Sequence, residues 1–284
     1  MGPMTKIALS IAGSEASGGA GAQTDIKTFA QLGVFGATSL TCIVSFDPHH
    51  DWSHRFVPID PQVIHDQIEA AVAVHGRIDA VKIGMLGTPT TIGVVAEALE
   101  QYRFEQVVLD PVLICKGQEP GAALDTDNAL RARILPHATM VTPNLFETRV
   151  LAGMDEITTV EQLEEGARRI HDQGVPCVLA KAGTLFDTGT ALDVFYDGST
   201  MEVLEVPAIG RERLHAGGRR HRRARQGGEP ARGGPHRQAG RRLGDRAPHA
   251  RQCAVRLRLP GLLRPLTPPP APQSAPAAIL HCAQ

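Results

Sequence analysis

The first apolar run of the chain is Ile7-Ala-Leu-Ser-Ile-Ala12, and it ends at Gly13. A short run of this kind, closed by a glycine, predicts a buried strand that leads into a loop. Residues 25–32 then repeat their apolar side chains at helical spacing, and Gly33 follows as the expected C-cap. A strand, a loop and a helix in this order indicate the first unit of an α/β fold.

The same alternation of strand and helix patterns continues to about residue 210. Strands that alternate with helices of about ten to fifteen residues are typical of a mostly parallel sheet flanked by helices. We therefore predict one α/β domain over residues 1–210, with a central, mostly parallel sheet and helices on both faces. Thr158-Thr-Val-Glu161 resembles a capping box that opens the last of these helices. The further strands are expected at 38–46, 80–84, 106–110, 138–142 and 176–181, and the further helices at 62–74, 91–102, 128–135 and 159–173.

The composition restricts the class of protein. Hydrophobic residues make up 42% of the 284 residues, which is enough for a sizeable core. No apolar run approaches a membrane span of about eighteen residues, and we expect no signal peptide at the N-terminus. The five cysteines are scattered without metal or CxxC spacing, so we expect reduced thiols and a cytoplasmic protein.

The composition changes abruptly near Ile209. Residues 1–210 carry 13 Lys and Arg against 27 Asp and Glu, whereas residues 211–284 carry 16 Arg, no Lys and three acids. Such a tail cannot bury a core, so we predict that it is disordered. It could attract nucleic-acid phosphates, but it lacks the interleaved aromatic residues that stack on bases. We expect instead a shift of reading frame near residues 210–216, because Arg, Gly, Pro and Ala are what a GC-rich gene yields in the wrong frame.

Five polar residues and one methionine stand where predicted strands end. In parallel sheets of this kind, ligands bind beyond the carboxyl ends of the strands. This placement predicts a binding site at that edge of the sheet. The residues concerned are Ser14, Glu15, Met85, Asp110, Asn144 and Lys181.

The glycine-rich segment 12–23 follows a strand and precedes a helix. Its glycines would let the backbone approach a ligand closely, and its N–H groups could bind anions or ring substituents. The segment matches neither the Walker A motif nor the GxGxxG nucleotide motif. An ordinary strand-to-helix turn is an equal alternative.

Four residues near later strand ends suit phosphoryl transfer, and each also has a structural alternative. Asp110 could hold Mg²⁺ against the phosphates of a nucleotide, or it could cap a turn. Asn144 and Glu147 lie three residues apart, which suits helix capping and also suits metal and phosphate contacts. Lys181 could meet a nucleotide phosphate, although a lone lysine is more often solvated.

The segment 47–54 holds His49, His50 and His54 beside two aspartates. A metal site is the less favoured interpretation, because the side chains of adjacent His49 and His50 diverge. We expect a mobile loop that covers a pocket as a lid and carries the only Trp. Cys115 is either a small buried residue or, if it faces the pocket, a thiol able to add reversibly to an aldehyde.

Together, these segments resemble the pyridoxal kinase and hydroxymethylpyrimidine kinase branch of the ribokinase-like superfamily. The resemblance covers about residues 6–210, and several long motifs in one order make it specific. Within the branch, residues 47–54 and Cys115-Lys-Gly117 resemble the pyridoxal kinases of Gram-positive type. The matching motifs are Ile11-Ala-Gly-Ser14, Ser17-Gly-Gly-Ala-Gly21, Asp25-Ile-Lys-Thr-Phe29, Lys82-Ile-Gly-Met-Leu-Gly87, Val108-Leu-Asp-Pro-Val112 and Val141-Thr-Pro-Asn-Leu-Phe-Glu147.

The resemblance implies a ribokinase-like kinase that uses Mg²⁺ and ATP to phosphorylate the 5-hydroxymethyl group of pyridoxal, pyridoxine or pyridoxamine. Hydroxymethylpyrimidine is the alternative substrate. A sugar kinase of the same fold is disfavoured, because the pocket would contain Met85 and Cys115. The resemblance also implies a homodimer. It assigns Mg²⁺ to Asp110 and Glu147, ATP to Asn144, Lys181 and Asp193, the substrate to Ser14, Gly19, Met85 and His54, and the catalytic role to Cys115.

Two departures from the family pattern bear on activity. Glu15 replaces the usual Asp, so a longer side chain could shift a contact with the substrate ring. The family also carries a Gly-Ala-Gly-Asp or Gly-Ala-Gly-Cys segment that forms an anion hole and assists the substrate hydroxyl. Here the corresponding place reads Glu212-Arg-Leu-His-Ala-Gly-Gly218, where the Arg-rich tail begins. We therefore predict that this polypeptide is inactive or poorly folded.

Overall fold

A computed structural model describes residues 5–50, 53–113, 120–184, 186 and 190–208, with the backbone alone for residues 120–123. Cys115 and the tail 211–284 lie outside the described residues, so the predictions made for them stay predictions. Within the described part, no helix has the length and apolar character needed to span a membrane.

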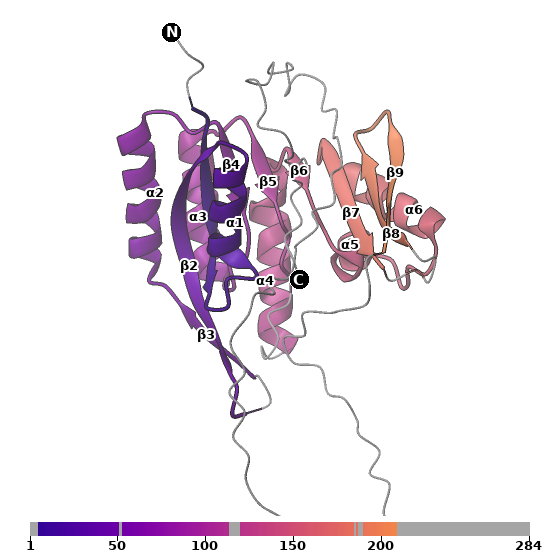
Figure 1. Cartoon of the computed structure of the whole chain (residues 1–284), viewed down its shortest axis with the longest axis horizontal. Helices are drawn as coiled ribbons and strands as arrows, with labels where there is room; N and C mark the ends of the chain where they lie inside the picture. The colour runs from indigo at the N-terminus through magenta and orange to yellow at the C-terminus, as the bar shows by residue number, and fades with distance from the viewer. Residues whose placement is uncertain (1–4, 51–52, 114–119, 185, 187–189, 209–284) are drawn as a thin grey trace, which may run out of the picture.

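One mixed sheet of nine strands forms the centre of the described chain (Figure 1). Its strands are β1 (Ile7–Glu15), β2 (Phe35–Asp47), β3 (Ser53–Pro58), β4 (Ala80–Ile83), β5 (Val107–Leu109), β6 (Met140–Val141), β7 (Cys177–Gly183), β8 (Thr190–Tyr196) and β9 (Met201–Pro207). They lie in the order β3-β2-β1-β4-β5-β6-β7-β8-β9. Neighbours from β2 to β7 run parallel, whereas β3, β8 and β9 add antiparallel edges. The mostly parallel sheet is thus confirmed.

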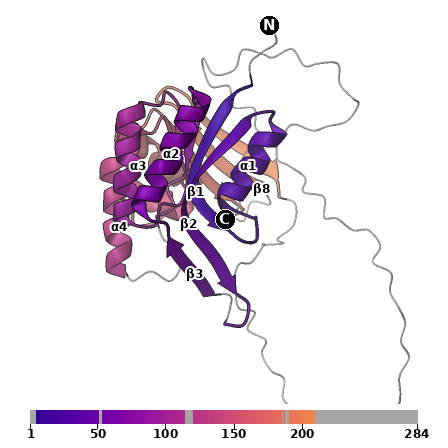
Figure 2. The same cartoon turned by 90° about the vertical axis from the view of Figure 1, so that its left-hand side faces the viewer.

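Helices cover both faces of this sheet, as predicted. They are α1 (Gly21–Gln31), α2 (Pro61–His75), α3 (Pro89–Tyr102), α4 (Pro120–Arg133), α5 (Leu145–Leu151) and α6 (Val160–His171), with a 3-10 turn, η1, at Leu135–His137. Figure 2 shows α2, α3 and α4 together on one face and α1 on the other. The central strands are therefore covered on both sides, which explains why they read as nearly continuous apolar runs.

Local signals in the sequence fix the ends of several elements. In α2, Asp60 caps the N-terminus by accepting a hydrogen bond from the Gln62 backbone N–H, and Gly76 ends the helix in the left-handed conformation. In the sheet core, Leu9 and Ile11 of β1 are fully buried. Ser10 and Ala12, which alternate with them along the strand, are buried as well, because both faces of β1 are covered.

Some element boundaries differ from the predictions. β1 continues through Ser14 to Glu15, and α1 begins at Gly21, four residues before the predicted start. The capping box of α6 is formed by Thr159 and Gln162, one residue beyond the predicted pair, because Thr158 lies outside the helix. β8 and β9 were not predicted; β9 is an edge strand whose residues are all partly or fully exposed.

The segment 47–54 is also different from the expected loop. Asp47 ends β2 and Ser53 begins β3; the two strands pair antiparallel, and the described residues 48–50 lie in a turn after β2. The far ends of β2 and β3 project beyond the other strands (Figures 1 and 2). Residues 51–52, including the Trp, lie outside the described chain. The lid function stays a prediction, but a paired hairpin carries it rather than an irregular loop.

Candidate active site

Two predicted residues meet directly at the carboxyl ends of the central strands. Asp110 follows β5, and Lys181 lies near the end of β7. The Lys181 Nζ is 3.2 Å from Asp110 Oδ1, and both side chains are largely buried. This pair joins strands that are separated by β6 in the sheet. Its position matches the edge at which sheets of this type bind their ligands.

Asn144 and Glu147 form a capping box at the start of α5. The Asn144 Oδ1 accepts from the Glu147 backbone N–H at 2.8 Å, and Glu147 Oε2 accepts from the Asn144 backbone N–H at 2.8 Å. The structural alternative for this pair is therefore confirmed. The same residues also lie beside Lys181, because Asn144 forms a β-bridge with it and Pro143 accepts a hydrogen bond from its N–H. The box thus faces the Asp110–Lys181 pair.

The electrostatics of Glu147 reflect this crowding. Burial raises the pKa of Glu147 to about 7, and the negative charge of Asp110 adds to the rise. Hydrogen bonds from Asn144 and the positive charge of Lys181 oppose it. Two buried carboxylates that repel one another form a site that a cation would stabilise. Oxygen donors of this kind are those that Mg²⁺ prefers, so Asp110 and Glu147 fit a magnesium ion.

Asp193 has a local structural role. It lies on β8, opposite Lys181 in the register of β7 and β8, and is 8% exposed. Its Oδ1 accepts from the backbone N–H groups of Ala182 at 3.2 Å and Gly183 at 3.5 Å. The register shifts between Lys181 and Gly183, so Asp193 pairs the backbone of a bulge beside the lysine. Its contact with ATP stays a prediction.

The glycine-rich loop is organised by Glu15. The Glu15 carboxylate accepts from the Ser17 N–H at 2.6 Å, from the Ser17 hydroxyl at 2.5 Å and from the Gly19 N–H at 3.2 Å. Burial works against ionisation, but these hydrogen bonds outweigh it and lower the pKa of Glu15. The longer side chain is therefore used within the loop itself, and it fixes Gly19, one of the predicted substrate contacts.

Ser14 is held by a residue that the sequence did not reveal as functional. The Gln23 Nε2 donates to Ser14 Oγ at 2.6 Å, and Gln23 Oε1 accepts from the Glu15 N–H at 3.2 Å. Gln23 lies on the first turn of α1, which begins at Gly21 with a φ of +66°. A Cβ on Gly21 would stand 2.3 Å from the Gly13 carbonyl oxygen, so only glycine lets the helix start this close to β1.

Met85 lies beside the glycine-rich loop, and its role in a pocket wall stays a prediction. It follows β4, is half-buried, and its Sδ is 3.6 Å from Cys42 Sγ on β2. The Met85 carbonyl accepts from the Thr41 hydroxyl at 2.6 Å. A Cβ added to Gly13 would meet both sulfur atoms, at 2.6 Å from Cys42 and 3.8 Å from Met85. Cys42 was not predicted, and the two sulfurs form one polarizable apolar surface next to the loop.

His54 lies on the projecting hairpin. Its ring meets Phe46 across the strand pair at a centroid distance of 4.6 Å, edge to face. At the turn, His50 Nδ1 lies 2.6 Å from Asp47 Oδ2. Phe56 from the same hairpin reaches Gly87, two residues beyond Met85. The hairpin therefore contacts the segment that carries Met85, whereas contact of His54 with a substrate stays a prediction.

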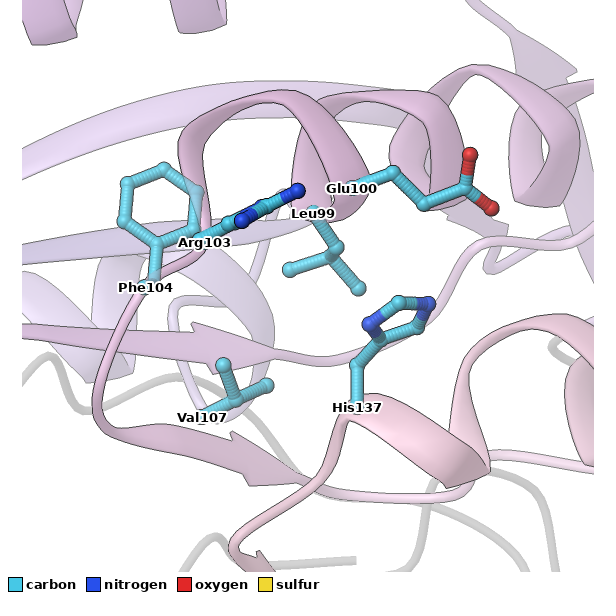
Figure 3. A pocket seen from close by; sticks show the side chains of 6 residues that line it. All are labelled: Leu99, Glu100, Arg103, Phe104, Val107 and His137. Atoms are coloured by element: carbon cyan, nitrogen blue, oxygen red, sulfur yellow. The ribbon is translucent and has the colours of Figure 1, made fainter.

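A cavity of about 420 Å³ lies at the other end of β5 (Figure 3). Val107, the first residue of β5, lines it, whereas Asp110 follows the last residue of that strand. The cavity holds none of the predicted site residues. Its lining is Leu99, Glu100, Arg103, Phe104, Val107 and His137.

Comparison with known proteins agrees with this geometry. A family profile described as phosphomethylpyrimidine kinase matches residues 15–220. A pyridoxine kinase of Bacillus subtilis is 43% identical over 211 residues, covering 74% of this chain and 78% of the relative. The hydroxymethylpyrimidine/phosphomethylpyrimidine kinase of the same organism is 35% identical, covering 74% and 76%.

Solved structures show the same fold. The ADP complex of Bacillus subtilis pyridoxal kinase matches with a TM-score of 0.69 and 42% identity, covering 75% of this chain and 79% of the other. The Staphylococcus aureus pyridoxal kinase in complex with AMP-PCP and pyridoxal matches with a TM-score of 0.68 and 36% identity, covering 75% and 76%. With its sheet order, its strand-end cluster and these likenesses, the chain belongs to the phosphomethylpyrimidine kinase family, with a ribokinase-like fold.

Proposed function

We propose that this protein belongs to vitamin B6 salvage as an ATP-dependent kinase that phosphorylates the 5-hydroxymethyl group of pyridoxal, pyridoxine or pyridoxamine. The observation that carries the proposal is the cluster of Asp110, Asn144, Glu147 and Lys181 at one edge of the sheet. In this cluster Lys181 is paired with Asp110, and both Asp110 and Glu147 are buried. Such a cluster supplies what phosphoryl transfer demands, namely cation binding and fixed positive charge near phosphates.

The choice of substrate is supported by the relatives. Two matching proteins, a pyridoxine kinase and a putative pyridoxine kinase, are 43% and 46% identical to the chain. The matching hydroxymethylpyrimidine/phosphomethylpyrimidine kinases are 35% and 36% identical. Pyridoxal and its analogues are therefore the favoured substrates, and hydroxymethylpyrimidine, a precursor of thiamine, is the second candidate.

On the nucleotide side, we assign Mg²⁺ to Asp110 and Glu147. A bound Mg²⁺ neutralises phosphate charge. Lys181 has a flexible stem and an ammonium group that could leave Asp110 for a phosphate oxygen. Asn144 fixes Glu147 through the capping box, so the carboxylate stays in place while its charge changes.

On the substrate side, the loop residues Ser14 and Gly19 offer polar groups, while Met85 offers an apolar wall. Gln23 and Glu15 fix the two loop positions through the hydrogen bonds described above. A flat aromatic ring with polar substituents suits a pocket with this mixture of surfaces. Contacts from His54, and the addition of the Cys115 thiol to an aldehyde, remain parts of this proposal.

The C-terminal segment determines whether this polypeptide is catalytically active. We propose that residues 211–284 replace the anion-hole segment by a shift of reading frame, so that this polypeptide is inactive or nearly so. Losing one such donor costs about 10²–10³ in rate. The homodimer and the cytoplasmic location also belong to the proposal. Nucleic-acid binding by the Arg-rich tail would instead appear as RNA binding with steep salt dependence, lost on truncation at Gly210.

Side-by-side kinase assays test the proposal. The chain and a frame-restored version are incubated with ATP, Mg²⁺ and one of three acceptors: pyridoxal, hydroxymethylpyrimidine or ribose. We expect the restored protein to phosphorylate pyridoxal fastest and ribose not at all, and the present chain to be at least about 10²-fold slower. A restored protein that phosphorylates none of the three acceptors would contradict the assignment. Ordinary turnover by the present chain would contradict only the effect of the tail.

A further inference from the structure

A line of buried charges continues from Asp110 into the protein. The Lys82 Nζ on β4 lies 4.0 Å from Asp110 Oδ2 and 3.1 Å from Asp25 Oδ2 on α1. The Ser10 hydroxyl on β1 donates to the same Asp25 oxygen at 2.6 Å. The side chain of Asp25 is 1% exposed and that of Lys82 is 11% exposed. Side chains from β1, β4, α1 and the end of β5 therefore form one continuous buried polar network.

This polar network has a defined geometry around Asp110. Ser10 and Lys82 are partners in the register of β1 and β4, so both side chains start from neighbouring points of the sheet. Lys181 approaches Asp110 at Oδ1, whereas Lys82 approaches it at Oδ2. The two oxygens of the carboxylate are thus faced by two different ammonium groups.

Stability alone does not account for these charges. A buried ion pair costs desolvation energy, and an apolar pair of similar volume often serves the fold equally well. An apolar pair in place of Asp25 and Lys82 would therefore be expected to keep the folding stability. Their contact with the proposed metal-binding carboxylate offers a reason for the arrangement that packing does not.

We propose that Lys82 is a positioning residue for Asp110, anchored by Asp25 and Ser10. The inference rests on the proposed function, in which Lys181 turns from Asp110 to a phosphate when a nucleotide binds. Lys82 is held by Asp25 and stays beside Asp110, so Asp110 keeps one fixed cationic neighbour. The carboxylate would then present the same orientation to Mg²⁺ before and after Lys181 moves.

The decisive variant removes the inner pair without changing the net charge. Asp25→Asn combined with Lys82→Met leaves no unpaired buried charge, so it avoids the instability that either single change would cause. The matched control is Lys6→Met, which removes a lysine whose Nζ lies 2.9 Å from Asp79 and whose side chain is 65% exposed. Lys82→Arg tests whether a cation at this place restores the effect.

The measurement is the affinity of the full chain for ADP and for AMP-PCP, each with Mg²⁺ and with EDTA, by titration calorimetry. Partners that orient metal ligands contribute about 10–100-fold to metal affinity. We expect the gain in nucleotide affinity due to Mg²⁺ to fall about tenfold or more in the double variant. Affinity in EDTA should stay within about twofold, Lys82→Arg should keep most of the gain, and Lys6→Met should match the unmodified chain.

Several results would overturn the inference. An unchanged Mg²⁺ gain in the double variant would show that the inner pair only supports the fold. An increased gain would show that Lys82 merely competes with the metal for Asp110. Parallel losses with Mg²⁺ and EDTA, together with a lower melting temperature, would also indicate a structural role. If neither the unmodified chain nor its frame-restored version binds a nucleotide, the proposed function fails along with the inference, and this outcome is recognisable before any variant is made.

Discussion

Replacing Glu147 with Gln is expected to flatten the pH dependence of folding stability. The unfolded chain ionises Glu147 near pH 4.5, whereas burial and the charge of Asp110 hold its pKa at about 7 in the folded protein. Between these two values the unfolded state has released the proton and the folded state has kept it. The free energy of unfolding therefore falls as pH rises from 4.5 to above 7.

The magnitude follows from the separation of the two pKa values. At about 1.4 kcal/mol for each pH unit, the folded protein loses about 3 kcal/mol of stability across this window. The side chain of Glu147 is almost fully buried, so solvent screens little of this effect. Gln keeps an oxygen that can accept from the Asn144 N–H, as Glu147 does at 2.8 Å, but it does not ionise.

Urea unfolding at pH 5, 6, 7 and 8, followed by far-UV circular dichroism, measures the effect. The unmodified chain should lose more stability than Glu147→Gln between pH 5 and pH 8. Mg²⁺ favours the ionised carboxylate, so it should restore stability at pH 8 in the unmodified chain but not in the variant.

Asp127→Asn provides the matched control. Burial raises the pKa of Asp127 to about 6, with the charge of Arg131 opposing the rise. Asp127 lies on α4, and burial and Arg131, rather than Asp110 or Glu147, shift its pKa, so its variant should keep the Mg²⁺ response at pH 8. Identical pH profiles for the unmodified chain and Glu147→Gln would refute the account of Glu147.

Three further changes probe the loop, the hairpin and the bulge. Gly87→Ala should cost about 1–3 kcal/mol in urea unfolding, because Gly87 has a φ of +79° and a Cβ would stand 2.4 Å from Phe56; Phe56→Leu in the same chain should recover part of the loss. Asp193→Ala should leave two bulge N–H groups unpaired, and so cost about 1–3 kcal/mol and weaken nucleotide binding, whereas unchanged stability would exclude the role of Asp193 in the bulge. Gln23→Ala should weaken pyridoxal binding about tenfold in calorimetry with no change for ADP, and equal losses for both ligands would contradict its specific support of Ser14.

The sequence predicts the strand-end part of the site well. Asp110, Asn144 and Lys181 each follow or end a strand pattern, and the carboxyl ends of parallel strands converge at one edge. The structure brings them together there, with Lys181 as the common partner. For such residues, the order of elements along the chain already indicates their neighbours.

Other contributors depend on how faces of different elements meet, which spacing along the chain does not reveal. Gln23 lies on the first turn of α1, and only the close approach of Gly21 to β1 brings it to Ser14. Lys82 and Asp25 lie in motifs that match the family, but the sequence does not show that they meet, which joins α1 to β4. A sequence pattern can identify these residues, but it does not show which partner each one contacts.

β9 and α5 were missed because their sequence patterns are weak. β9 alternates partly exposed and exposed residues, so it lacks the continuous apolar run of a central strand. α5 has seven residues, which is too short for a helical period to stand out. Its start was nevertheless signalled by Asn144 and Glu147 at capping-box spacing.

We propose that the cluster at the carboxyl ends of the strands binds a nucleotide together with Mg²⁺. The most direct test of this proposal compares AMP-PCP affinity in Mg²⁺ for the unmodified chain, Lys181→Met and the surface control Lys6→Met. We expect a loss of about tenfold or more for Lys181→Met, since a charged hydrogen bond to phosphate contributes about 1.5–3 kcal/mol, and no change for Lys6→Met. Equal affinities for all three proteins would contradict it.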